Sequence, residues 1–330
     1  MSEPQDSPDL LPLPPVIRIE PASACNLRCT HCPTGVVSMP RSVMKPEIFD
    51  RVVEEVRKHV PPIRVAVLYH GGEPLLNKNF VAMAGRVKAL GIPFVKTVSN
   101  GMLIRPDNVA ALVQSGLDAI EISLDGTSPE DNNNIRKRSD FERICRAIHD
   151  LVAARRTLGS RIKVFVATTQ FLSRDAPEVD RPAALPQFMQ TAFADIAGEI
   201  EFKATWAKLW PSEQPSAGYD LLFDDRPREE PRTCSLLEET MSIRADGNVV
   251  ACCYDLTSMS HLGNIATQSL AEIWRGHLYR KFREDFASGD YPALCRGCVV
   301  VTGDKYLLHK RTPRPQAVYS MMSLGNAPVR

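Results

Sequence analysis

Three cysteines near the start of the chain have the spacing of a metal-binding loop. Cys25, Cys29 and Cys32 form a C-x3-C-x2-C pattern that contains His31. Three neighbouring thiolates can hold three corners of a cubane iron–sulfur cluster and leave the fourth iron open to another ligand. A structural zinc site takes four protein ligands, so zinc would need His31 as the fourth. Spacing alone leaves both interpretations open.

Three further segments follow β-rich runs at the point where each run ends. They are residues 70–74 (His-Gly-Gly-Glu-Pro), 99–101 (Ser-Asn-Gly) and 123–126 (Ser-Leu-Asp-Gly). Paired glycines let the backbone approach a ligand closely, and the polar side chains offer it donors and acceptors. Because the carboxyl ends of parallel strands meet at one face, we expect these segments and the cysteine loop to surround one ligand.

A second group of cysteines lies in the last third of the chain. Its members are Cys234, Cys252, Cys253, Cys295 and Cys298. A ligand before a hairpin, one at its end and a closing C-x2-C after a helix can converge on one ion or cluster. Four-cysteine zinc and an iron–sulfur cluster both fit this spacing.

Cys252 and Cys253 are neighbours on an expected strand, where successive side chains point to opposite faces. Only one of them can therefore ligate easily. Cys253 is interpreted as an ordinary buried thiol, with an alternative ligand or a hydrogen-atom donor as the other possibilities. The ninth cysteine, Cys145, lies among apolar residues at helical spacing and is expected in the core.

Six β-rich runs position these segments. They cover residues 16–21, 64–70, 93–100, 119–125, 161–170 and 199–207, with amphipathic stretches such as 46–59, 80–90 and 141–155 between them. Strands joined by helix-sized connections are parallel, with right-handed crossovers. The chain is therefore expected to form a curled α/β sheet or an incomplete barrel that gathers ligands at its strand ends.

The pattern changes after residue 207. Prolines and charges over residues 209–233 predict a long loop. Residues 240–254 predict a hairpin around Asp246-Gly247. A capping box from Ser269 to Glu272 predicts one helix over residues 270–287. The tail beyond Asp304 carries Lys and Arg without acidic residues and is expected to be a solvated or docking extension.

Together, the cysteine loop and the strand-end segments resemble the radical S-adenosylmethionine (SAM) superfamily. The resemblance implies a partial (β/α)6 barrel with a 4Fe-4S cluster on Cys25, Cys29 and Cys32, whose open iron chelates SAM. Reductive cleavage of SAM would give methionine and a 5′-deoxyadenosyl radical, which removes a hydrogen atom from the substrate. The residues that the resemblance assigns to SAM are His31, Gly71, Gly72, Glu73, Pro74, Ser99, Asn100, Ser123, Asp125 and Arg136.

Residues 234–298 resemble the SPASM/twitch extension of such enzymes, including the Leu-Gly-Asn-Ile segment at 262–265. The resemblance implies an auxiliary 4Fe-4S cluster on Cys234, Cys252, Cys295 and Cys298. Full SPASM members carry additional cysteines for a second auxiliary cluster, and this sequence lacks them. The twitch type, with one auxiliary cluster and two 4Fe-4S clusters in all, is therefore expected.

The expected organisation has five parts. They are a flexible extension (1–15), the radical SAM partial barrel (16–207), a linker and active-site loop (208–233), a small α+β SPASM/twitch domain (234–303) and a basic tail (304–330). The loops over 173–186 and 209–233 are expected to select the substrate, through polar residues that include Arg174, Asp175, Asp220, Asp224 and Arg226.

Three reactions would follow from the same radical. The auxiliary cluster favours oxidation, because the sequence shows no other electron acceptor. Epimerisation would need Cys253 as hydrogen-atom donor, and a peptide substrate would make the protein a maturase. Only residues 1–15 precede the first run, too few for a leader-peptide domain. A small polar substrate, such as a sugar or aminocyclitol, is therefore expected, and a separate peptide-binding partner stays open.

The composition limits the other classes of function. The formal net charge is +1 and hydrophobic residues make up 44% of the 330 residues, so no global field favours nucleic acid or a membrane surface. No export signal is visible, and nine cysteines in a cytoplasmic protein are best interpreted as metal ligands. A flavodoxin or ferredoxin is the expected electron donor. A non-catalytic iron–sulfur or zinc protein is disfavoured, because it would need no cofactor cradle.

Overall fold

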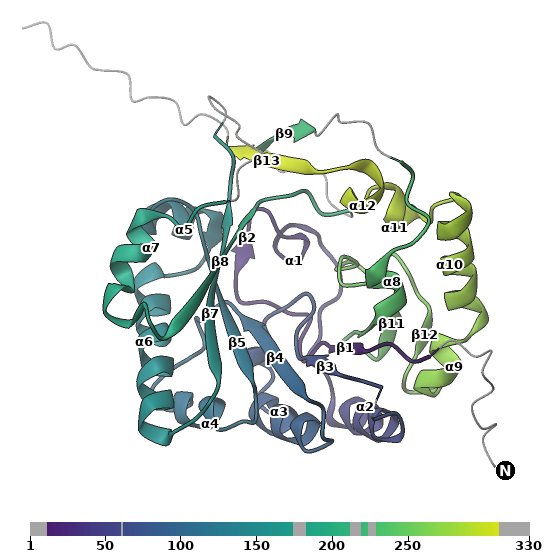
Figure 1. Ribbon diagram of the computed structural model, residues 1–330, viewed down its shortest axis with the longest axis horizontal. Coiled ribbons are helices and arrows are strands. Elements are labelled where there is room, and N and C mark those ends of the chain that lie inside the picture. Colours follow the sequence, from purple (N-terminus) through teal and green to yellow (C-terminus); the bar gives the residue numbers. More distant parts are fainter. Residues whose placement is uncertain (1–11, 61, 174–182, 212–218, 224–228, 310–330) are drawn as a thin grey trace, which may run out of the picture.

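The computed structural model describes residues 12–309 except 61, 174–182, 212–218 and 224–228. Nine strands form one sheet in the order β12-β11-β10-β1-β3-β4-β5-β7-β8 (Figure 1). The strands of its barrel part are β1 (Val16–Ile19), β3 (Val65–Val67), β4 (Phe94–Ser99), β5 (Ala119–Asp125), β7 (Lys163–Gln170) and β8 (Ile200–Trp206). All five pairings among these strands are parallel. Each strand lies inside one of the six predicted runs, so the α/β partial barrel is confirmed.

Helices cover the outer face of this sheet (Figure 1). They are α2 (Pro46–Lys58), α3 (Phe80–Lys88), α4 (Val109–Val113), α5 (Pro129–Ile135), α6 (Phe141–Leu158) and α7 (Gln187–Ala192), with 3-10 turns η1 (Pro74–Leu76) and η2 (Ala194–Ile196). In α2, Phe49, Val52 and Val56 are buried at helical spacing against the sheet. The inner face of the sheet is thereby left to line a cavity.

The C-terminal region continues the same sheet. β10 (Thr240–Ile243) pairs in parallel with β1, followed by β11 (Asn248–Val250) and β12 (Gly263–Asn264) in antiparallel pairing. The predicted hairpin at Asp246-Gly247 is confirmed, and Gly247 adopts the positive φ of 87° that this turn requires. One hydrophobic core runs through both regions.

A buried ion pair joins the two regions beside the β1–β10 pairing. The Glu20 carboxylate accepts hydrogen bonds from Arg244 Nε at 2.9 Å and from the backbone N–H of Ala245 at 3.0 Å. Its other oxygen accepts from the backbone N–H of Gly71 at 3.0 Å. Glu20 therefore ties β1, the glycine segment and the end of β10 together.

The prediction of one helix over residues 270–287 is wrong in one respect. The capping box is present, but the chain forms two helices, α9 (Leu270–Trp274) and α10 (His277–Ser288). Gly276 caps the second helix in an extended conformation, and a Cβ there would lie 2.5 Å from the Glu272 carbonyl oxygen. The helix is therefore interrupted at an extended residue, and a side chain there would collide with the preceding turn.

The expected loop over residues 209–233 contains a strand, and the start of the tail, expected as a solvated or docking extension, contains another. β9 (Tyr219–Phe223) pairs antiparallel with β13 (Lys305–His309). Leu307 and Tyr306 are buried by this pairing, so apolar side chains hold the start of the tail against the barrel. Arg174, Asp175, Asp224 and Arg226 lie outside the described residues, whereas Asp220 lies in β9.

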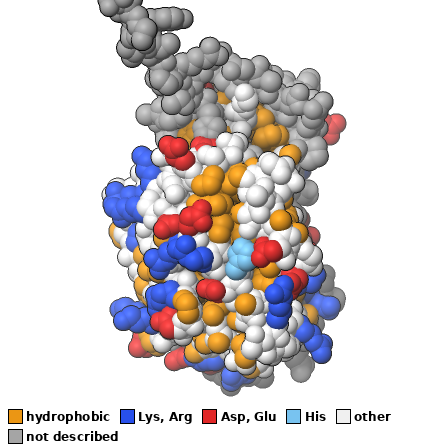
Figure 2. Space-filling model, turned by 90° about the vertical axis from the view of Figure 1, so that its left-hand side faces the viewer, with side chains coloured by type: hydrophobic (Ala, Val, Ile, Leu, Met, Phe, Trp, Pro, Cys, Tyr) orange, Lys and Arg blue, Asp and Glu red, His pale blue; other side chains and the backbone are white. Residues whose placement is uncertain are grey.

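The remaining elements are short. Antiparallel β2 (Arg28–Cys29) and β6 (Arg136–Lys137) pair, and α1 (Pro33–Val36) follows the cysteine loop; α8 (Ser235–Glu239), α11 (Ala293–Arg296) and α12 (Val299–Thr302) belong to the C-terminal region. On the face that carries α6 and α7, basic and acidic side chains are interspersed (Figure 2). Within the described ranges, no helix is long and apolar enough to cross a membrane.

Candidate functional site

The inner face of the barrel and the C-terminal region enclose a cavity of about 410 Å³. Most of the residues that the sequence assigns to SAM line it together with the three cysteines of the first loop. They are Cys25, Cys29, His31, Cys32, Gly71, Gly72, Glu73, Ser99, Asn100, Ser123 and Arg136. Pro74 begins η1 instead, and Asp125 lies behind Arg136. The structure thus brings four separate segments to one place.

Pairing of β2 with β6 holds the cysteine loop. Cys29 lies opposite Arg136, and the backbone N–H of Thr30 donates to the Ile135 carbonyl at 2.9 Å. Burial raises the pKa of the Cys25 thiol to about 11 and that of Cys29 to about 12. Thiols in such surroundings lose their protons when they bind a metal. Three thiols facing one polar cavity fit an iron–sulfur cluster with an open iron.

The glycine segment packs directly on the cysteine loop. A Cβ on Gly72 would lie 2.2 Å from the Ala22 carbonyl oxygen and 2.4 Å from that of Ala24. The backbone N–H of Glu73 also donates to the Ala24 carbonyl at 2.8 Å. Only glycine permits this contact, which positions the segment against the cysteines.

Glu73 connects two strand ends rather than projecting freely into the cavity. Its carboxylate accepts from Leu75 N at 3.1 Å, Ser99 Oγ at 2.9 Å and Asn100 N at 2.8 Å. Asn100 in turn donates to Asn26 Oδ1 at 2.8 Å in the cysteine loop. Burial raises the pKa of Glu73, while these hydrogen bonds oppose the shift. Glu73 therefore fixes the position of the glycine segment relative to the end of β4.

Asp125, Arg136 and His31 form a charged group beside the cysteines. Arg136 Nη1 donates to Asp125 Oδ2 at 2.7 Å, and His31 Nε2 lies 3.7 Å from the same oxygen. Burial would raise the pKa of Asp125, but the charges of Arg136 and His31, together with hydrogen bonds from Arg136 and the Thr169 backbone, lower it below its usual value. His31 Nδ1 and Arg136 Nε are buried and have no hydrogen-bond partner among the described residues. These two atoms fit a polar ligand in the cavity.

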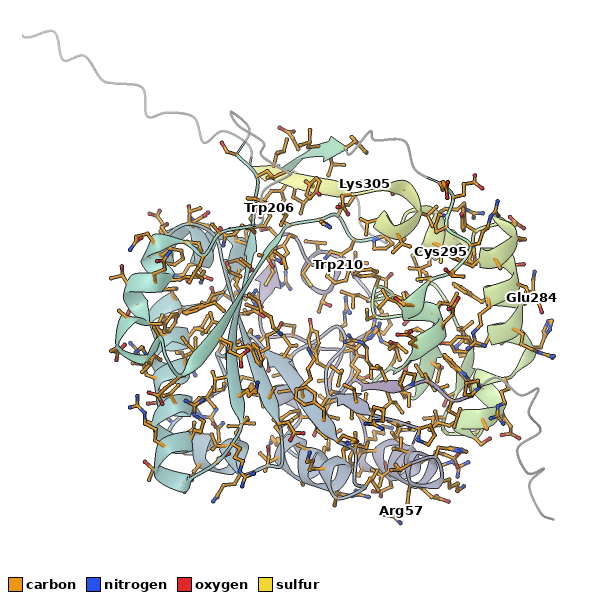
Figure 3. All side chains as sticks on the ribbon, in the orientation of Figure 1. Arg57, Trp206, Trp210, Glu284, Cys295 and Lys305 are labelled. Carbon is orange, nitrogen blue, oxygen red and sulfur yellow. The ribbon has the colours of Figure 1, made fainter. Side chains whose placement is uncertain are left out.

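The second group of cysteines surrounds a different, much smaller hollow of about 20 Å³. Cys234, Cys252, Cys295 and Cys298 line it with apolar side chains that include Leu237, Phe282, Phe286 and Leu294. Figure 3 shows Cys295 on the C-terminal side of the molecule, with Trp210 between it and the barrel. Four thiols in one apolar hollow fit an enclosed iron–sulfur cluster.

Cys253 is not among the residues that line this small hollow. It lines the 410 Å³ cavity instead. The expected strand through Cys252 and Cys253 is wrong at this point, because β11 ends at Val250 and the two cysteines lie in the bend and turn that follow it. Cys145 is buried in α6, as expected for a core thiol. Within the described part of the chain, no three His, Cys, Asp or Glu side chains converge on a point where one metal ion would bind. The cluster assignments therefore rest on thiol number and on the shared hollows.

Sequence reasoning missed several residues of the large cavity. They are Arg18, Tyr69, Lys96, Glu121, Lys203, Trp210 and Tyr254. Four of them point inward at alternate positions of the strands, which is the signal that would have identified them. Trp210 and Tyr254 pack edge to face, with ring centroids 5.5 Å apart, and come from loops without a recognisable pattern.

Two family models match the sequence. The model of the radical SAM superfamily matches residues 19–165, and that of the SPASM iron–sulfur cluster-binding domain matches residues 234–299. This chain belongs to the radical SAM superfamily and carries a C-terminal SPASM domain. It is accordingly an enzyme that binds SAM and a 4Fe-4S cluster through the first region and auxiliary iron–sulfur through the second.

The curated relatives show more than one activity. GTP 3′,8-cyclase of Chlorobaculum tepidum is 34% identical over 143 residues, which is 42% of this chain and 41% of the cyclase. The match thus spans about two fifths of the length of the first curated relatives. Mycofactocin maturase MftC of Mycobacterium ulcerans is 24% identical over 302 residues, 83% of this chain and 77% of the maturase.

Solved structures share the fold at low identity. BtrN in complex with AdoMet and 2-DOIA has a TM-score of 0.53 and 15% identity, covering 89% of this chain and 93% of BtrN. Streptococcus suis SuiB bound to precursor peptide SuiA has a TM-score of 0.55 and 14% identity, covering 83% and 68%. The fold therefore extends to the C-terminal region, where the sheet continues.

Proposed function

We propose that this chain removes a hydrogen atom from a small polar substrate and oxidises it. The observation that carries this proposal is the arrangement of the two cysteine sites. The three-cysteine loop faces the large cavity, the four-cysteine hollow lies apart from it, and Tyr254 lines both spaces. A substrate in the large cavity would then lie between a radical source and an electron acceptor.

Seven cysteines would hold two clusters in this proposal. Cys25, Cys29 and Cys32 would hold the first, and Cys234, Cys252, Cys295 and Cys298 the second. When bound, the first cluster supplies the electron that cleaves SAM, and the second supplies an electron acceptor. We place the protein in the cytoplasm, where thiols stay reduced, with a flavodoxin or ferredoxin as electron donor.

The chain itself positions and encloses the reactants. Glu73 and Asn100 hold two strand ends against the cysteine loop, and Gly72 allows the close packing described above. The buried, unpartnered nitrogens of His31 and Arg136 would be satisfied by polar groups of SAM. Aromatic side chains at the mouth, Trp210 and Tyr254, would exclude water from the reacting atoms.

The space in the cavity supports a small substrate beside SAM. A second hollow of about 320 Å³ adjoins the first and shares His31, Trp210 and Tyr254 with it. Ligand pockets for small molecules have volumes of roughly 300 to 1,000 Å³. The matches to maturases support a peptide as the alternative substrate, which a panel of peptides would test in the same assay.

The test is anaerobic reconstitution of the full chain, followed by iron and sulfide counts and quantification of 5′-deoxyadenosine after adding dithionite and SAM. About eight irons per chain and deoxyadenosine formation are expected for two 4Fe-4S clusters. About four irons would mean that only one cluster is bound, so the electron acceptor on which the proposed oxidation depends would be missing. A colourless protein fully loaded with zinc would overturn the proposal as a whole.

Epimerisation is the second candidate, because Cys253 lines the same cavity as the SAM residues. A thiol there could return a hydrogen atom to the substrate radical from the side opposite SAM. In deuterated water, a Cys253 donor would place deuterium in the product. Cys253→Ala would then stop product while leaving both clusters intact, with Cys145→Ala as the matched control. Unlabelled, oxidised product from Cys253→Ala would exclude this candidate.

A further inference from the structure

Four charged side chains form a group on the inner face of the barrel, below the residues assigned to SAM. Arg18 of β1, Lys96 of β4, Glu121 of β5 and Lys203 of β8 all line the large cavity. Lys96 precedes Ser99 by three positions in β4. At about 3.3 Å per strand residue, it lies roughly 10 Å deeper than the strand end. The group is therefore spatially distinct from the SAM segments.

The cations of this group exceed its carboxylates. Lys203 Nζ donates to Glu121 Oε2 at 2.8 Å and lies 4.1 Å from the centroid of the Phe165 ring, so this pair is largely neutral. Arg18 and Lys96 form no ion pair with a described carboxylate, and Arg18 Nε is buried with no hydrogen-bond partner in the same described ranges. Burial lowers the pKa of Lys96; Lys203 and Arg18 add to the shift, while Glu121 opposes it.

Unpaired cations held together in a partly buried cavity repel one another and have lost part of their hydration. An anion between them would offset both costs. The four side chains sum to a formal charge of +2, which would balance the charge of a phosphate monoester, about −1.5 to −2 at pH 7. An arginine beside lysines is also a common set of phosphate ligands.

We infer that Arg18 and Lys96, assisted by Lys203, bind a phosphate group of the substrate. The inference rests on the proposed function, because it assigns the cavity below SAM to the substrate. Arg18 and Cys253 line the same cavity. A phosphate held there would anchor one end of the substrate on the C-terminal side and leave the rest to extend toward SAM.

The inference is tested by calorimetric titration of inorganic phosphate into the desalted, reconstituted full chain, with and without saturating SAM. We expect the wild type to bind phosphate equally well in both conditions. Lys96→Gln and Arg18→Gln should each weaken binding at least about tenfold, as expected for loss of a charge-assisted contact. Lys163→Gln is the matched control, because Lys163 is exposed and pairs with Glu201 at 3.2 Å.

Three outcomes would overturn the inference. They are no phosphate binding to the wild type, unchanged binding in folded Lys96→Gln and Arg18→Gln, and displacement of phosphate by SAM. Tighter binding of malonate than of phosphate would overturn the assignment of phosphate in favour of a dicarboxylate. If a glutamine variant fails to fold, Lys203→Gln replaces it, since Lys203 is more exposed.

Iron content and deoxyadenosine formation, measured on the same samples, separate this inference from the proposed function. Deoxyadenosine formation without phosphate binding would contradict the phosphate site and leave the proposed function standing. Phosphate binding that depends on Lys96, in a protein that does not cleave SAM, would contradict the proposed function and support the phosphate site.

Discussion

The two cysteine sites differ most in what surrounds their thiols. At the first, three thiols from one short loop face a large cavity whose walls carry His31, Arg136 and backbone groups of the glycine segment. At the second, four thiols from three distant segments line a small hollow walled by leucine and phenylalanine side chains. Burial raises the pKa of Cys29 at the first site and of Cys295 at the second.

The thiols are thus similar, and their surroundings set the chemistry. An incomplete set of ligands next to a polar cavity leaves a metal free to bind a reactant. A complete set inside apolar walls excludes solvent and suits a group that only exchanges electrons. This difference implies that each site can be removed by itself, with separate consequences.

Removal of a thiol at the first site should have the largest effect. Cys29→Ala leaves two thiols in the loop, so iron content should fall by about four per chain and deoxyadenosine formation by about a thousandfold or more. Anaerobic iron analysis and product quantification check this prediction. Cys145→Ala, the same change in the core of α6, should retain both. Sustained deoxyadenosine formation by Cys29→Ala would show that the first cluster is misassigned.

At the second site, Cys295→Ala should lose the auxiliary cluster yet keep SAM cleavage. We expect about four irons per chain, measurable deoxyadenosine and no oxidised product. The measurement pairs iron analysis with product analysis on the wild type's own substrate. Normal product from this variant would mean that the second site has a structural role only.

The close packing of the glycine segment against the first loop is tested by Gly72→Ala. A methyl group cannot fit 2.2 Å from the Ala22 carbonyl oxygen, so the segment must move. SAM cleavage should fall at least about tenfold, since displacement of a cofactor segment by an ångström costs that much or more. Gly198→Ala, where a Cβ meets nothing within 4 Å, is the control. Equal activity of the two variants would show that this contact does not position SAM.

The buried link between the two regions is tested by Glu20→Gln, which leaves Arg244 without its carboxylate. Breaking a buried ion pair should cost about 3 kcal/mol of unfolding free energy. Asp50→Asn makes the same change in an exposed pair with Arg86, whose side chains are 59% and 47% exposed. It should cost less than about 1 kcal/mol. Thermal unfolding of the two variants measures the difference, and equal losses would contradict a structural link.

A surface histidine should have the smallest effect, because it is not among the residues that line the two cysteine sites. Burial would lower the pKa of His149, but hydrogen bonds to the Cys145 carbonyl and to Asp195 raise it above 6.5. The protonated form is therefore favoured in the folded state. Its contribution is complete below pH 6.5 and disappears as the pH rises through the folded pKa.

For His149→Gln we expect a Tm lower than wild type by less than about 2 °C at pH 5.5 and no difference at pH 8.5. Thermal scans of both proteins across this range check the sign. A difference that grows with pH would show that His149 is neutral in the folded protein.

Short motifs in the sequence predicted the strand-end segments and the two sets of cysteines. Each strand end carries its own segment, and cysteine spacing marks both sites. The pairing of β9 with β13 and the partners of Glu20 depend on residues far apart in the chain, for which a single sequence offers no signal. The sequence placed Cys252 and Cys253 on a strand, but the strand ends at Val250, so the turn after it, and not alternation, decides which cavity each thiol lines.

The pairing of β1 with β10 also determines when the barrel can close. Glu20 and Arg244 are 224 positions apart, and at about 5 to 20 residues per second a ribosome needs roughly 10 to 45 s to make the chain between them. Throughout that interval β1 is an edge strand, and the loop with Cys25, Cys29 and Cys32 has emerged without the region that later covers it. Metal delivery to the first site and protection of its thiols from oxygen therefore matter most during synthesis, before the last quarter of the chain is made.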